Sequence, residues 1–383
     1  MPEKPAVDLV YFDAGGGHRS AATALQSVLV SPDWNWDARL VNLQEVLDSL
    51  DIFRKLTGIR LQDIYNLVLA KNWTLGSAQL LRAMHAVIRV YHPAQVRVLT
   101  AFWRARRPDL AVSLVPNFNR ALFQSLQRAV PGTAFVTVLT DLADYPPHFW
   151  MERQPQYLIC GTRHAVKQAA AMGYSESRVF QTSGMILRPQ FYDLPEIDRA
   201  EERRRIGLAV DVPTGLLLFG GAGSNAMQGI AERLGNSAVD VQLIVLCGRN
   251  AKLRQRLQML RARNKIVVEG FTTEVPRYMQ LCDFFIGKPG PGSISEALHM
   301  GLPVIVEKNA WTLPQERYNA DWIREQGVGI VLRSFRNIES AVRDLLAGDH
   351  LQRMKARAAA LQNRALFEIP PVLEHILNTS NAR

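Results

Sequence analysis

Short apolar runs alternate with longer segments of helical periodicity along almost the whole chain. Runs that predict strands occupy residues 8–12, 39–43, 110–115, 134–139, 157–160 and 178–181 in the first half, and residues 215–219, 241–246, 265–268, 283–286, 304–306 and 329–332 in the second half. This alternation is the pattern of parallel α/β architecture. A helical block over residues 61–107 interrupts it, so we interpret the block as an insertion on the sheet framework, at about residues 52–108.

The alternation breaks once near the middle, where a stretch with Gly and Pro over residues 184–195 leads into a charged helical segment over residues 197–206. A chain of 383 residues is longer than one hydrophobic core usually organises. We therefore predict two Rossmann-like domains, over residues 1–187 and 188–365, that face each other across a cleft. A C-terminal helix and tail over residues 366–383 could pack back on the first domain.

Composition narrows the class of protein. With 48% hydrophobic and 21% charged residues, the chain is neither disordered nor a disulfide scaffold. It has no continuous apolar run of about 18 residues, which a membrane-spanning helix needs, and its first residues lack the pattern of a signal peptide. The cysteines Cys160, Cys247 and Cys282 are scattered, so we expect buried small side chains in a reducing compartment. These features predict a cytoplasmic protein.

The net charge of +10 is concentrated in the inserted block. Between Ile52 and Pro108 the only acidic residue is Asp63, and the basic residues are Arg54, Lys55, Arg60, Lys71, Arg82, Arg89, Arg97, Arg104, Arg106 and Arg107. Apolar residues at helical spacing form two stripes among them, one of Leu80, Met84, Val87, Ile88 and Tyr91 and one of Val98, Phe102 and Trp103. Such a basic amphipathic surface suits an anionic membrane. A solvated face of packed helices is the alternative, and nucleic acid is a weaker one.

The first glycine-rich loop is Asp13-Ala-Gly-Gly-Gly-His18, which follows the first predicted strand and opens a helix. Glycines permit a tight turn there, and a helix N-terminus favours negative charge. A dinucleotide fingerprint is disfavoured, because Ser20 stands at its third glycine position and the second strand ends without an acidic residue. His18 at the start of this helix is placed to act as a general base, with a purely structural histidine as the alternative.

A second loop, Phe219-Gly-Gly-Ala-Gly-Ser-Asn225, contains Gly221 and Gly223 and repeats this geometry in the other half of the chain. Backbone N–H groups from both loops could bridge a diphosphate. An ordinary strand-to-helix turn is the alternative.

The third constellation is the most specific. Gly290-Pro-Gly292-Ser293 follows a strand and predicts a helix that starts at Ser293, with free N–H groups for phosphate. Glu296, three residues later, has the right offset for ribose hydroxyls, and Gln315 and Glu316 open the next helix, where they could bind sugar hydroxyls. Glu296 could instead be the capping-box partner of Ser293.

Taken together, these motifs resemble those of the monogalactosyldiacylglycerol synthases and the related processive diacylglycerol glucosyltransferases, in the group that contains the MurG-type GlcNAc transferase. The resemblance rests on residues 15–18, 139–142, 246–250, 270–271, 290–303 and 314–316, and it covers roughly residues 7–345. It implies a GT-B fold, a UDP-sugar donor bound by the second domain and a lipid acceptor bound by the first at a membrane surface. It also implies that His18 is the base, that Gly17 borders the site and that Asp141 supports the acceptor side.

The residues predicted to bind the donor are Gly221, Gly223, Arg249, Phe271, Gly290, Gly292, Ser293, Glu296, Gln315 and Glu316. By resemblance, Phe271 lies beside the uracil, Arg249 and Ser293 near the phosphates, Glu296 at the ribose and the Gln-Glu pair at the hexose. One departure from the family pattern concerns residues 304–314, a segment that includes Trp311. This segment is longer than the family's usual connection, and it lacks the glycine of the family's Pro-Gly-Gln-Glu motif. This departure leaves galactose, glucose, GlcNAc and glucuronic acid open as the donor sugar.

The sequence thus predicts an enzyme that moves a hexose from a UDP-sugar to a lipid hydroxyl, with diacylglycerol as the expected acceptor. We expect it to need no metal or cofactor and to associate peripherally with the inner face of the membrane. The alternatives are a UDP-sugar epimerase of the same fold and a MurG-like GlcNAc transferase that uses another lipid. A non-enzymatic protein that binds nucleotide or nucleic acid would not need His18 or the Gln-Glu pair.

Overall fold

A computed structural model describes residues 4–13, 16–48 and 77–381, with side chains from residue 88 onward in the last range. The described chain forms two compact units: unit 1 holds the residues up to Arg188 and those from Asn363 on, and unit 2 holds Pro189–Gln362. Gly15 and most of the inserted block before residue 77, with Arg54, Lys55, Arg60 and Lys71, lie outside the described residues.

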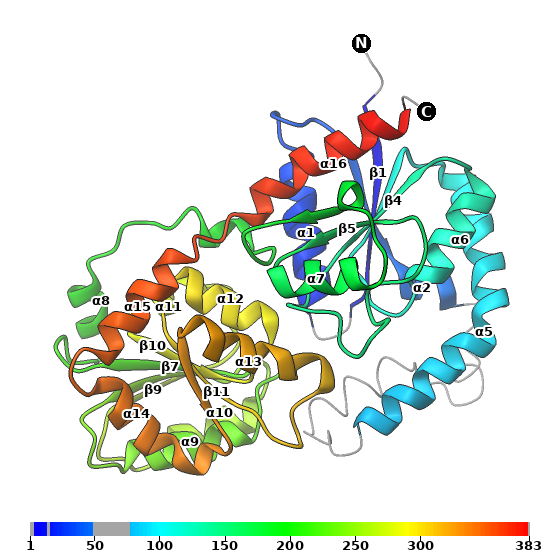
Figure 1. The fold of residues 1–383 in the computed structure, drawn as a ribbon. Coiled ribbons are helices and arrows are strands. Elements are labelled where there is room, and N and C mark those ends of the chain that lie inside the picture. The colour runs from blue at the N-terminus through cyan, green and yellow to red at the C-terminus, as the bar shows by residue number, and fades with distance from the viewer. Residues whose placement is uncertain (1–3, 14–15, 49–76, 382–383) are drawn as a thin grey trace. The chain divides into compact units, whose positions relative to one another are not determined.

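Unit 1 is built on a six-stranded parallel sheet in the order β2-β1-β3-β4-β5-β6 (Figure 1). Its strands are β1 (Ala6–Tyr11), β2 (Asp37–Asn42), β3 (Leu110–Ser113), β4 (Ala134–Val138), β5 (Tyr157–Cys160) and β6 (Val179–Gln181). Its helices are α1 (Gly17–Leu29), α2 (Leu43–Leu47), α5 (Ser77–Arg106), α6 (Asn119–Ala129), α7 (Arg163–Ala171), η2 (Glu176–Arg178) and α16 (Ala365–Asn381).

Unit 2 repeats the plan with a six-stranded parallel sheet in the order β12-β11-β10-β7-β8-β9. Its strands are β7 (Thr214–Leu218), β8 (Gln242–Leu246), β9 (Ile266–Glu269), β10 (Phe284–Gly287), β11 (Val304–Glu307) and β12 (Gly329–Leu332). Its helices are η3 (Pro189–Phe191), α8 (Arg199–Arg205), α9 (Ala226–Gly235), α10 (Ala251–Gln258), α11 (Val275–Gln280), α12 (Pro291–His299), η4 (Pro314–Glu316), α13 (Arg317–Gln326), η5 (Phe335–Asn337), α14 (Ile338–Leu346) and α15 (His350–Ala360). All twelve predicted strands are present, which confirms the α/β prediction.

The strand order reverses once in each sheet, between β1 and β3 in unit 1 and between β7 and β10 in unit 2. In open parallel sheets, ligands bind outside the carboxyl ends of the strands at such a reversal, because the flanking loops lead to opposite faces of the sheet. In unit 1, α1 follows β1 and packs in one core, whereas α6 follows β3 and packs in another. The topology therefore marks the loop after each of these four strands as a candidate binding element.

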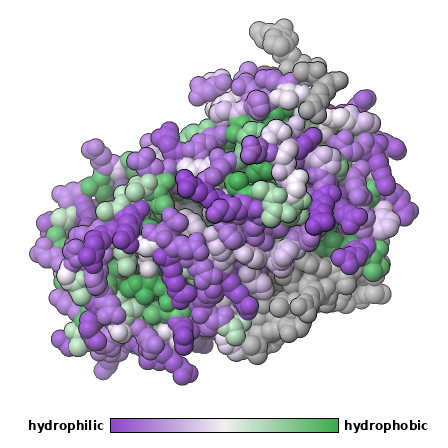
Figure 2. All heavy atoms as spheres, in the orientation of Figure 1, coloured by the Kyte–Doolittle hydropathy of each residue, from purple (hydrophilic) through white to green (hydrophobic). Residues whose placement is uncertain are grey.

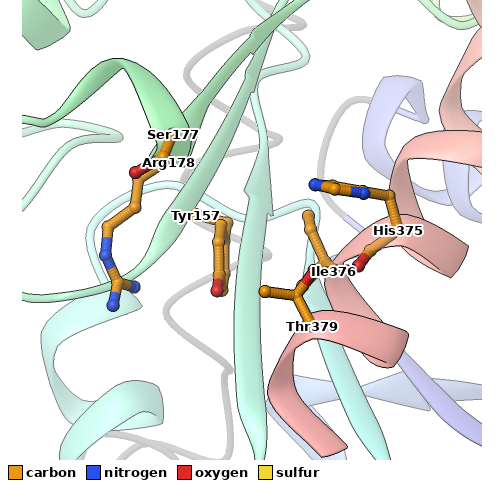
Figure 3. A pocket seen from close by; sticks show the side chains of 6 residues that line it. All are labelled: Tyr157, Ser177, Arg178, His375, Ile376 and Thr379. Carbon is orange, nitrogen blue, oxygen red and sulfur yellow. Dashed lines mark hydrogen bonds between the residues drawn. The ribbon is translucent and has the colours of Figure 1, made fainter. Parts of the chain in front are cut away.

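Helix α16 closes the core of unit 1. Its buried residues Ile369, Leu373, Ile376 and Leu377 pack with α1 and with strands of the sheet. A small cavity of about 80 Å³ lies between α16 and β5, with the guanidinium of Arg178 on one side of the Tyr157 ring and side chains of α16 on the other (Figure 3). It is far smaller than the roughly 300 Å³ that a small-molecule site usually needs.

Helix α5 is the described part of the basic block, and the sheet holds it through a buried charge. Asp8 on β1 is fully buried and pairs with Arg106 of α5 at 3.0 Å and with Arg39 of β2 at 2.9 Å. Trp103 is fully buried, and its indole N–H donates to the Ser125 hydroxyl of α6 at 3.0 Å. The expectation that Trp103 belongs to a membrane-facing surface is therefore wrong, because its side chain lies in the interior of unit 1, whereas Arg106 is partly exposed and pairs with buried Asp8.

Other residues of α5, and Arg107 directly after it, are exposed. The side chains of Arg89, Arg97, Arg104 and Arg107 are exposed, and Val90 is 75% exposed. The side chains of Arg82, Leu80, Met84 and Val87 lie outside the described residues. Among the helices that the structure describes, none is long and apolar enough to cross a membrane. Hydrophilic residues cover most of the molecular face drawn in Figure 2.

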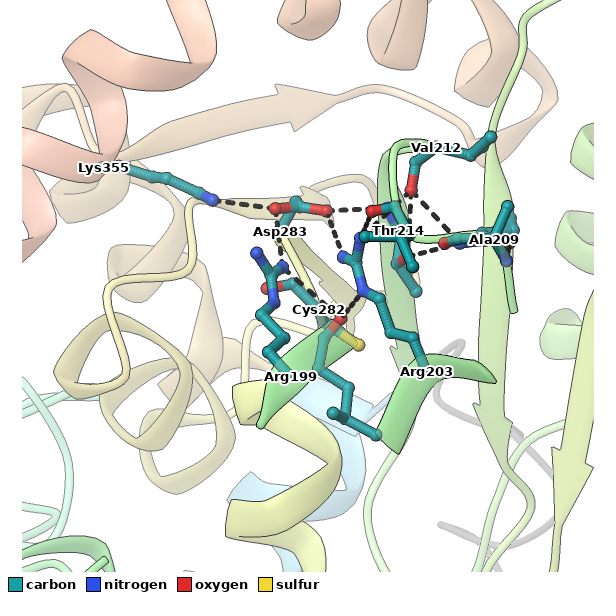
Figure 4. Close-up of polar contacts among 11 residues, drawn as sticks. Arg199, Arg203, Ala209, Val212, Thr214, Cys282, Asp283 and Lys355 are labelled. Atoms are coloured by element: carbon teal, nitrogen blue, oxygen red, sulfur yellow. Dashed lines mark hydrogen bonds and ion pairs between the residues drawn. The ribbon is translucent and has the colours of Figure 1, made fainter. Parts of the chain in front are cut away.

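A buried carboxylate also organises unit 2. Asp283, just before β10, accepts hydrogen bonds from Arg199 at 2.8 Å, from Arg203 at 2.7 Å and from Lys355 at 3.0 Å (Figure 4). The backbone N–H of Thr214 at the start of β7 donates to the same carboxylate at 2.9 Å. Burial alone would raise the pKa of Asp283, but the Arg199 hydrogen bond and the charge of Lys355 outweigh it and hold the pKa well below its ordinary value.

We predict that Asp283→Asn lowers the free energy of unfolding of unit 2 by about 3–5 kcal/mol, because Arg203 would stay buried without its anionic partner. In the native protein this stabilisation is present above the ordinary carboxyl pKa of about 4 and is lost as the pH falls below it, since folding depresses the pKa. Denaturant titration between pH 7 and pH 3 measures both effects. Glu339→Gln, which breaks the exposed pair with Arg343, is the control and should change stability by less than about 0.5 kcal/mol. Equal effects of the two substitutions would contradict the prediction.

Candidate functional site

In unit 1, three loops at the carboxyl edge of the sheet meet around His18. Helix α1 begins at Gly17 after Gly16, whose φ of 78° lies in the left-handed region that glycine favours. The turn brings His18 Nδ1 to 2.9 Å from the Thr140 hydroxyl, which follows β4. The ring also hydrogen-bonds the backbone of Leu114, directly after β3. His18 thus lies at the strand-order reversal of unit 1.

The environment of His18 favours the neutral imidazole. Desolvation by burial lowers the pKa of His18 to about 4, and the hydrogen bond with the Leu114 backbone opposes this effect only in part. Both named partners of the ring, a hydroxyl and a peptide group, are uncharged. At neutral pH this side chain is therefore able to accept a proton.

Asp141 is linked to the ring of His18 through Trp150. The indole of Trp150 donates to the Asp141 carboxylate at 2.9 Å, and the Trp150 ring centroid is 5.8 Å from that of His18. Asp144 accepts the backbone N–H of Trp150 at 2.6 Å, which fixes the loop that carries the indole. Burial raises the pKa of Asp144, and the hydrogen bonds from residues 148, 150 and 151 counteract it. Asp141 is thus placed as a positioning residue.

In unit 2, the loop after β7 interlocks with the loop after β8. Gly220 and Gly223 have φ values of 77° and 65°, and a Cβ on Gly223 would lie 2.5 Å from the carbonyl oxygen of Cys247. The N–H of Arg249 donates to the carbonyl of Gly221 at 2.9 Å. Close backbone packing therefore explains Gly223. Gly221 is exposed, and a Cβ added to it would meet open space.

Arg249 and Phe271 also come together. The guanidinium of Arg249 lies 4.7 Å from the centroid of the Phe271 ring, which is 55% exposed. The two residues follow β8 and β9, which are neighbours in the sheet. An exposed aromatic face beside a cation suits a planar base joined to an anionic group.

Helix α12 begins earlier than the sequence predicts. It starts at Pro291, with Gly290 as the N-cap residue and no side-chain cap, so the predicted start at Ser293 is wrong. Proline is favoured at the first helical position because it has no N–H to satisfy there. The first helical hydrogen bond runs from Ile294 to Gly290, which leaves the N–H groups of Gly292 and Ser293 at the open helix end.

This correction removes the capping-box explanation of Glu296. A capping box requires a serine at the N-cap, whereas Ser293 is the third residue of the helix. Glu296 is half-buried and lies three residues beyond Ser293, so the two side chains share one face of α12.

The predicted hexose residues lie in η4, a short 3₁₀ turn that precedes α13. The Glu316 carboxylate is 7% exposed and is paired with Lys288 at 2.8 Å, while Gln315 beside it is half-buried. Sequence reasoning assigned no role to Lys288, Thr140 or Trp150. Thr140 stands within the motif at residues 139–142 and Lys288 stands just before the motif at residues 290–303, but the residues they contact are far apart in the sequence.

The structure describes no group of three or more His, Cys, Asp or Glu residues arranged to hold a metal ion within its residue ranges. Each cysteine is buried, and burial raises the pKa of Cys160 to about 12 and that of Cys247 to about 11. Burial also raises the pKa of Cys282. These thiols pack as small apolar side chains, as the sequence predicts.

Comparison with known proteins identifies the family. The glycosyltransferase family 28 C-terminal domain matches residues 216–368. Monogalactosyldiacylglycerol synthase 3, chloroplastic, of Arabidopsis thaliana is 28% identical, over 96% of this chain and 80% of its own length. The probable monogalactosyldiacylglycerol synthase 3, chloroplastic, of Oryza sativa subsp. japonica is 30% identical, over 94% of this chain and 72% of its own length.

Solved structures share the fold at low sequence identity. A UDP co-structure of S. aureus MnaA aligns with a TM-score of 0.61 at 14% identity, over 98% of this chain and 97% of that one. MurG of Acinetobacter baumannii aligns with a TM-score of 0.59 at 12% identity, over the whole of both chains. The predicted GT-B fold is confirmed, and the chain belongs to the monogalactosyldiacylglycerol synthase family of glycosyltransferases.

Proposed function

We propose that this glycosyltransferase moves a hexose from a UDP-sugar to the hydroxyl of diacylglycerol at the inner face of a membrane. The observation that carries the proposal is the position of His18 at the strand-order reversal of unit 1, where its ring is hydrogen-bonded to Thr140. Membership of the family supports the choice of acceptor. The departure at residues 304–314 keeps the donor hexose open among galactose, glucose, GlcNAc and glucuronic acid.

In the proposed mechanism, His18 accepts the proton of the acceptor hydroxyl as the oxygen attacks the anomeric carbon. Thr140 and the Leu114 backbone orient the ring, and Asp141 acts through Trp150 to hold the surrounding loop. A base with a pKa of about 4 is a weak proton acceptor, but a nearby anionic diphosphate would raise that pKa in the ternary complex. General-base catalysis of this kind is typically worth about 10²–10⁴ in rate.

The leaving UDP is proposed to bind unit 2 without a metal ion or other cofactor. The N–H groups of Gly292 and Ser293 at the start of α12 favour an anion, as a helix N-terminus generally does. Arg249 adds a positive charge beside Phe271, which supports stacking on a uracil base. Glu296 would accept the ribose hydroxyls, and Gln315 and Glu316 would bind the hexose.

The exposed arginines of α5 support a membrane surface as the place of reaction. Arg89, Arg97 and Arg104 are exposed on α5 and Arg107 is exposed directly after it, and each basic residue near an anionic bilayer contributes about 1 kcal/mol. Attraction to such a surface would bring the site near an acceptor that stays in the bilayer.

Purified protein incubated with a panel of UDP-sugars, with and without vesicles that contain diacylglycerol, tests the proposal. Mass spectrometry of the lipids should find one hexose added, and only when vesicles are present. An epimerised UDP-sugar formed without vesicles would overturn the proposal in favour of an epimerase. Transfer to another lipid but not to diacylglycerol would replace the acceptor.

We predict that His18→Ala lowers the transfer rate by at least about 10²-fold, because it removes the general base. The affinity for UDP, measured by calorimetry, should stay unchanged because the donor residues lie in unit 2. His375→Ala, an exposed histidine of α16, is the matched control and should keep full activity. A His18→Ala rate within threefold of the native rate would remove His18 from the mechanism.

The pH profile gives a second prediction for the same residue. Because the pKa of His18 is lowered to about 4, the base stays neutral at pH 5.5, and kcat/KM should remain close to its maximum there. The acidic limb should appear only as the pH approaches 4. A loss centred on pH 6–7 would show an ordinary histidine pKa and contradict the assignment.

We predict that Glu296→Ala raises the donor KM by about tenfold or more, since a charge-assisted hydrogen bond to the ribose is lost. The melting temperature should change little, because Ser293 is not the N-cap and no capping box is broken. Steady-state kinetics and thermal unfolding of the same preparation measure both quantities. A variant with native UDP affinity and a lower melting temperature would assign Glu296 a structural role.

Replacement of Arg89, Arg97, Arg104 and Arg107 with Gln should weaken binding to anionic vesicles by about 1 kcal/mol for each residue that reaches the surface. Added salt should weaken binding of the native protein in the same way. Arg106→Gln is the contrasting variant: it should destabilise unit 1, because Arg106 pairs with buried Asp8. Co-sedimentation that is equal with neutral and anionic vesicles would leave α5 as a solvated surface.

A further inference from the structure

Two segments of unit 2 are joined by two side-chain contacts at the carboxyl edge of the sheet. Lys288, directly after β10, pairs with Glu316 of η4 at 2.8 Å. Asn319 of α13 donates its amide N–H to the carbonyl of Pro289 at 2.8 Å. A Cβ on Gly290 would lie 3.3 Å from Lys288 Cε and 3.5 Å from Glu316 Oε1, so the ion pair packs directly against Gly290. Residues 288–290 are thus fixed to η4 and α13 as one body.

The buried side chain of Asn319 carries a cost in stability. It is fully buried, and its amide oxygen has no partner among the described residues. A buried polar atom without a partner costs roughly 1–3 kcal/mol. Packing alone does not explain an asparagine at this position. The hydrogen bond from its amide N–H to the Pro289 carbonyl explains it better.

We call the contacts of Lys288 with Glu316 and of Asn319 with Pro289 the clamp, and the position of the segments that it joins indicates its function. One loop leads into α12, whose N-terminus is proposed to bind the leaving phosphates, and the other carries Gln315 and Glu316, proposed to bind the hexose. The bond that breaks in the reaction joins the hexose to the phosphate. An error of about 1 Å in the relative position of two such groups can cost about 10²-fold in rate.

We propose that Lys288 and Asn319 are positioning residues that hold the hexose-binding carboxylate of Glu316 at a fixed distance from the phosphate-binding end of α12. This inference rests on the proposed function and extends it to two residues with no assigned role. Lys288 acts through Glu316, and Asn319 acts through the Pro289 carbonyl. Together, Lys288 and Asn319 couple the residues proposed to bind the hexose to those proposed to bind the nucleotide.

The test compares Lys288→Met, Asn319→Leu and Glu316→Ala with the double variant Lys288→Met/Glu316→Ala. The single variants at 288 and 319 should lower kcat/KM for the UDP-hexose by about tenfold or more and keep the affinity for UDP within about threefold of native. The double variant should be no worse than Glu316→Ala by more than about twofold, since Lys288 acts through Glu316. Independent, multiplicative losses would overturn the proposal.

Lys308→Met is the matched control. Lys308 directly follows β11 and pairs with Asp321 of α13 at 2.6 Å, so it resembles Lys288 in its place after a strand and its bond to a carboxylate on the neighbouring element. Its removal should leave kcat/KM for the UDP-hexose unchanged. A loss equal to that of Lys288→Met would show that any ion pair at this edge has the same effect and would overturn the clamp.

Hydrogen exchange of the protein without ligand separates this inference from the proposed function. In Lys288→Met and Asn319→Leu, exchange of residues 290–293 and 315–319 should rise together, whereas Lys308→Met should leave residues 290–293 unchanged. If the native protein transfers no hexose, the proposed function fails while a coupled rise still supports the clamp. Exchange that rises in only one of the two segments, or in neither, overturns the clamp whatever the native activity.

Discussion

The reversal of strand order in each sheet is the constraint on which the rest of the site depends. Beside the first strand of each unit the chain turns to build the sheet in the other direction, so the loops after β1 and β3, and after β7 and β10, diverge. His18 and Leu114 occupy the first pair of loops, and Gly221 and Lys288 occupy the second. The strand order alone therefore determines which loops of each unit carry the candidate site residues.

Stability and chemistry are divided between the two edges of the unit 2 sheet. Asp283 lies at the amino end of β10 and gathers Arg199, Arg203 and Lys355, so that α8 and α15 are fixed to the sheet by charge. The carboxyl end of the same strand carries Lys288. Because β10 lies beside the strand-order reversal, its amino end stabilises the unit and its carboxyl end is free to carry groups that serve binding.

The sequence predicts the elements well and the contacts poorly. Most of the twelve strands are apolar runs between helical segments, and that local signal is enough to find them even where the strand is only partly buried, as in β6, β9 and β12. The start of α12 is misplaced by two residues because Pro291 and Ser293 are both good helix starts. Trp103 is misassigned because a basic amphipathic helix has the same pattern whether its apolar face meets a sheet or a membrane. The contact of His18 with Thr140 spans 122 positions and depends on tertiary structure alone.

The candidate residues of the two units have different electrostatic environments. The described surroundings of His18 supply a hydroxyl, a peptide group and an indole, all of them uncharged, and its burial favours the neutral imidazole. Under the proposed function unit 2 binds an anion, and the charge of Lys288 is already balanced by Glu316. The positive groups proposed for the diphosphate are therefore Arg249 and the N-terminus of α12, whereas Lys288 holds the Glu316 carboxylate in place. The ion pair would then serve the hexose rather than the nucleotide.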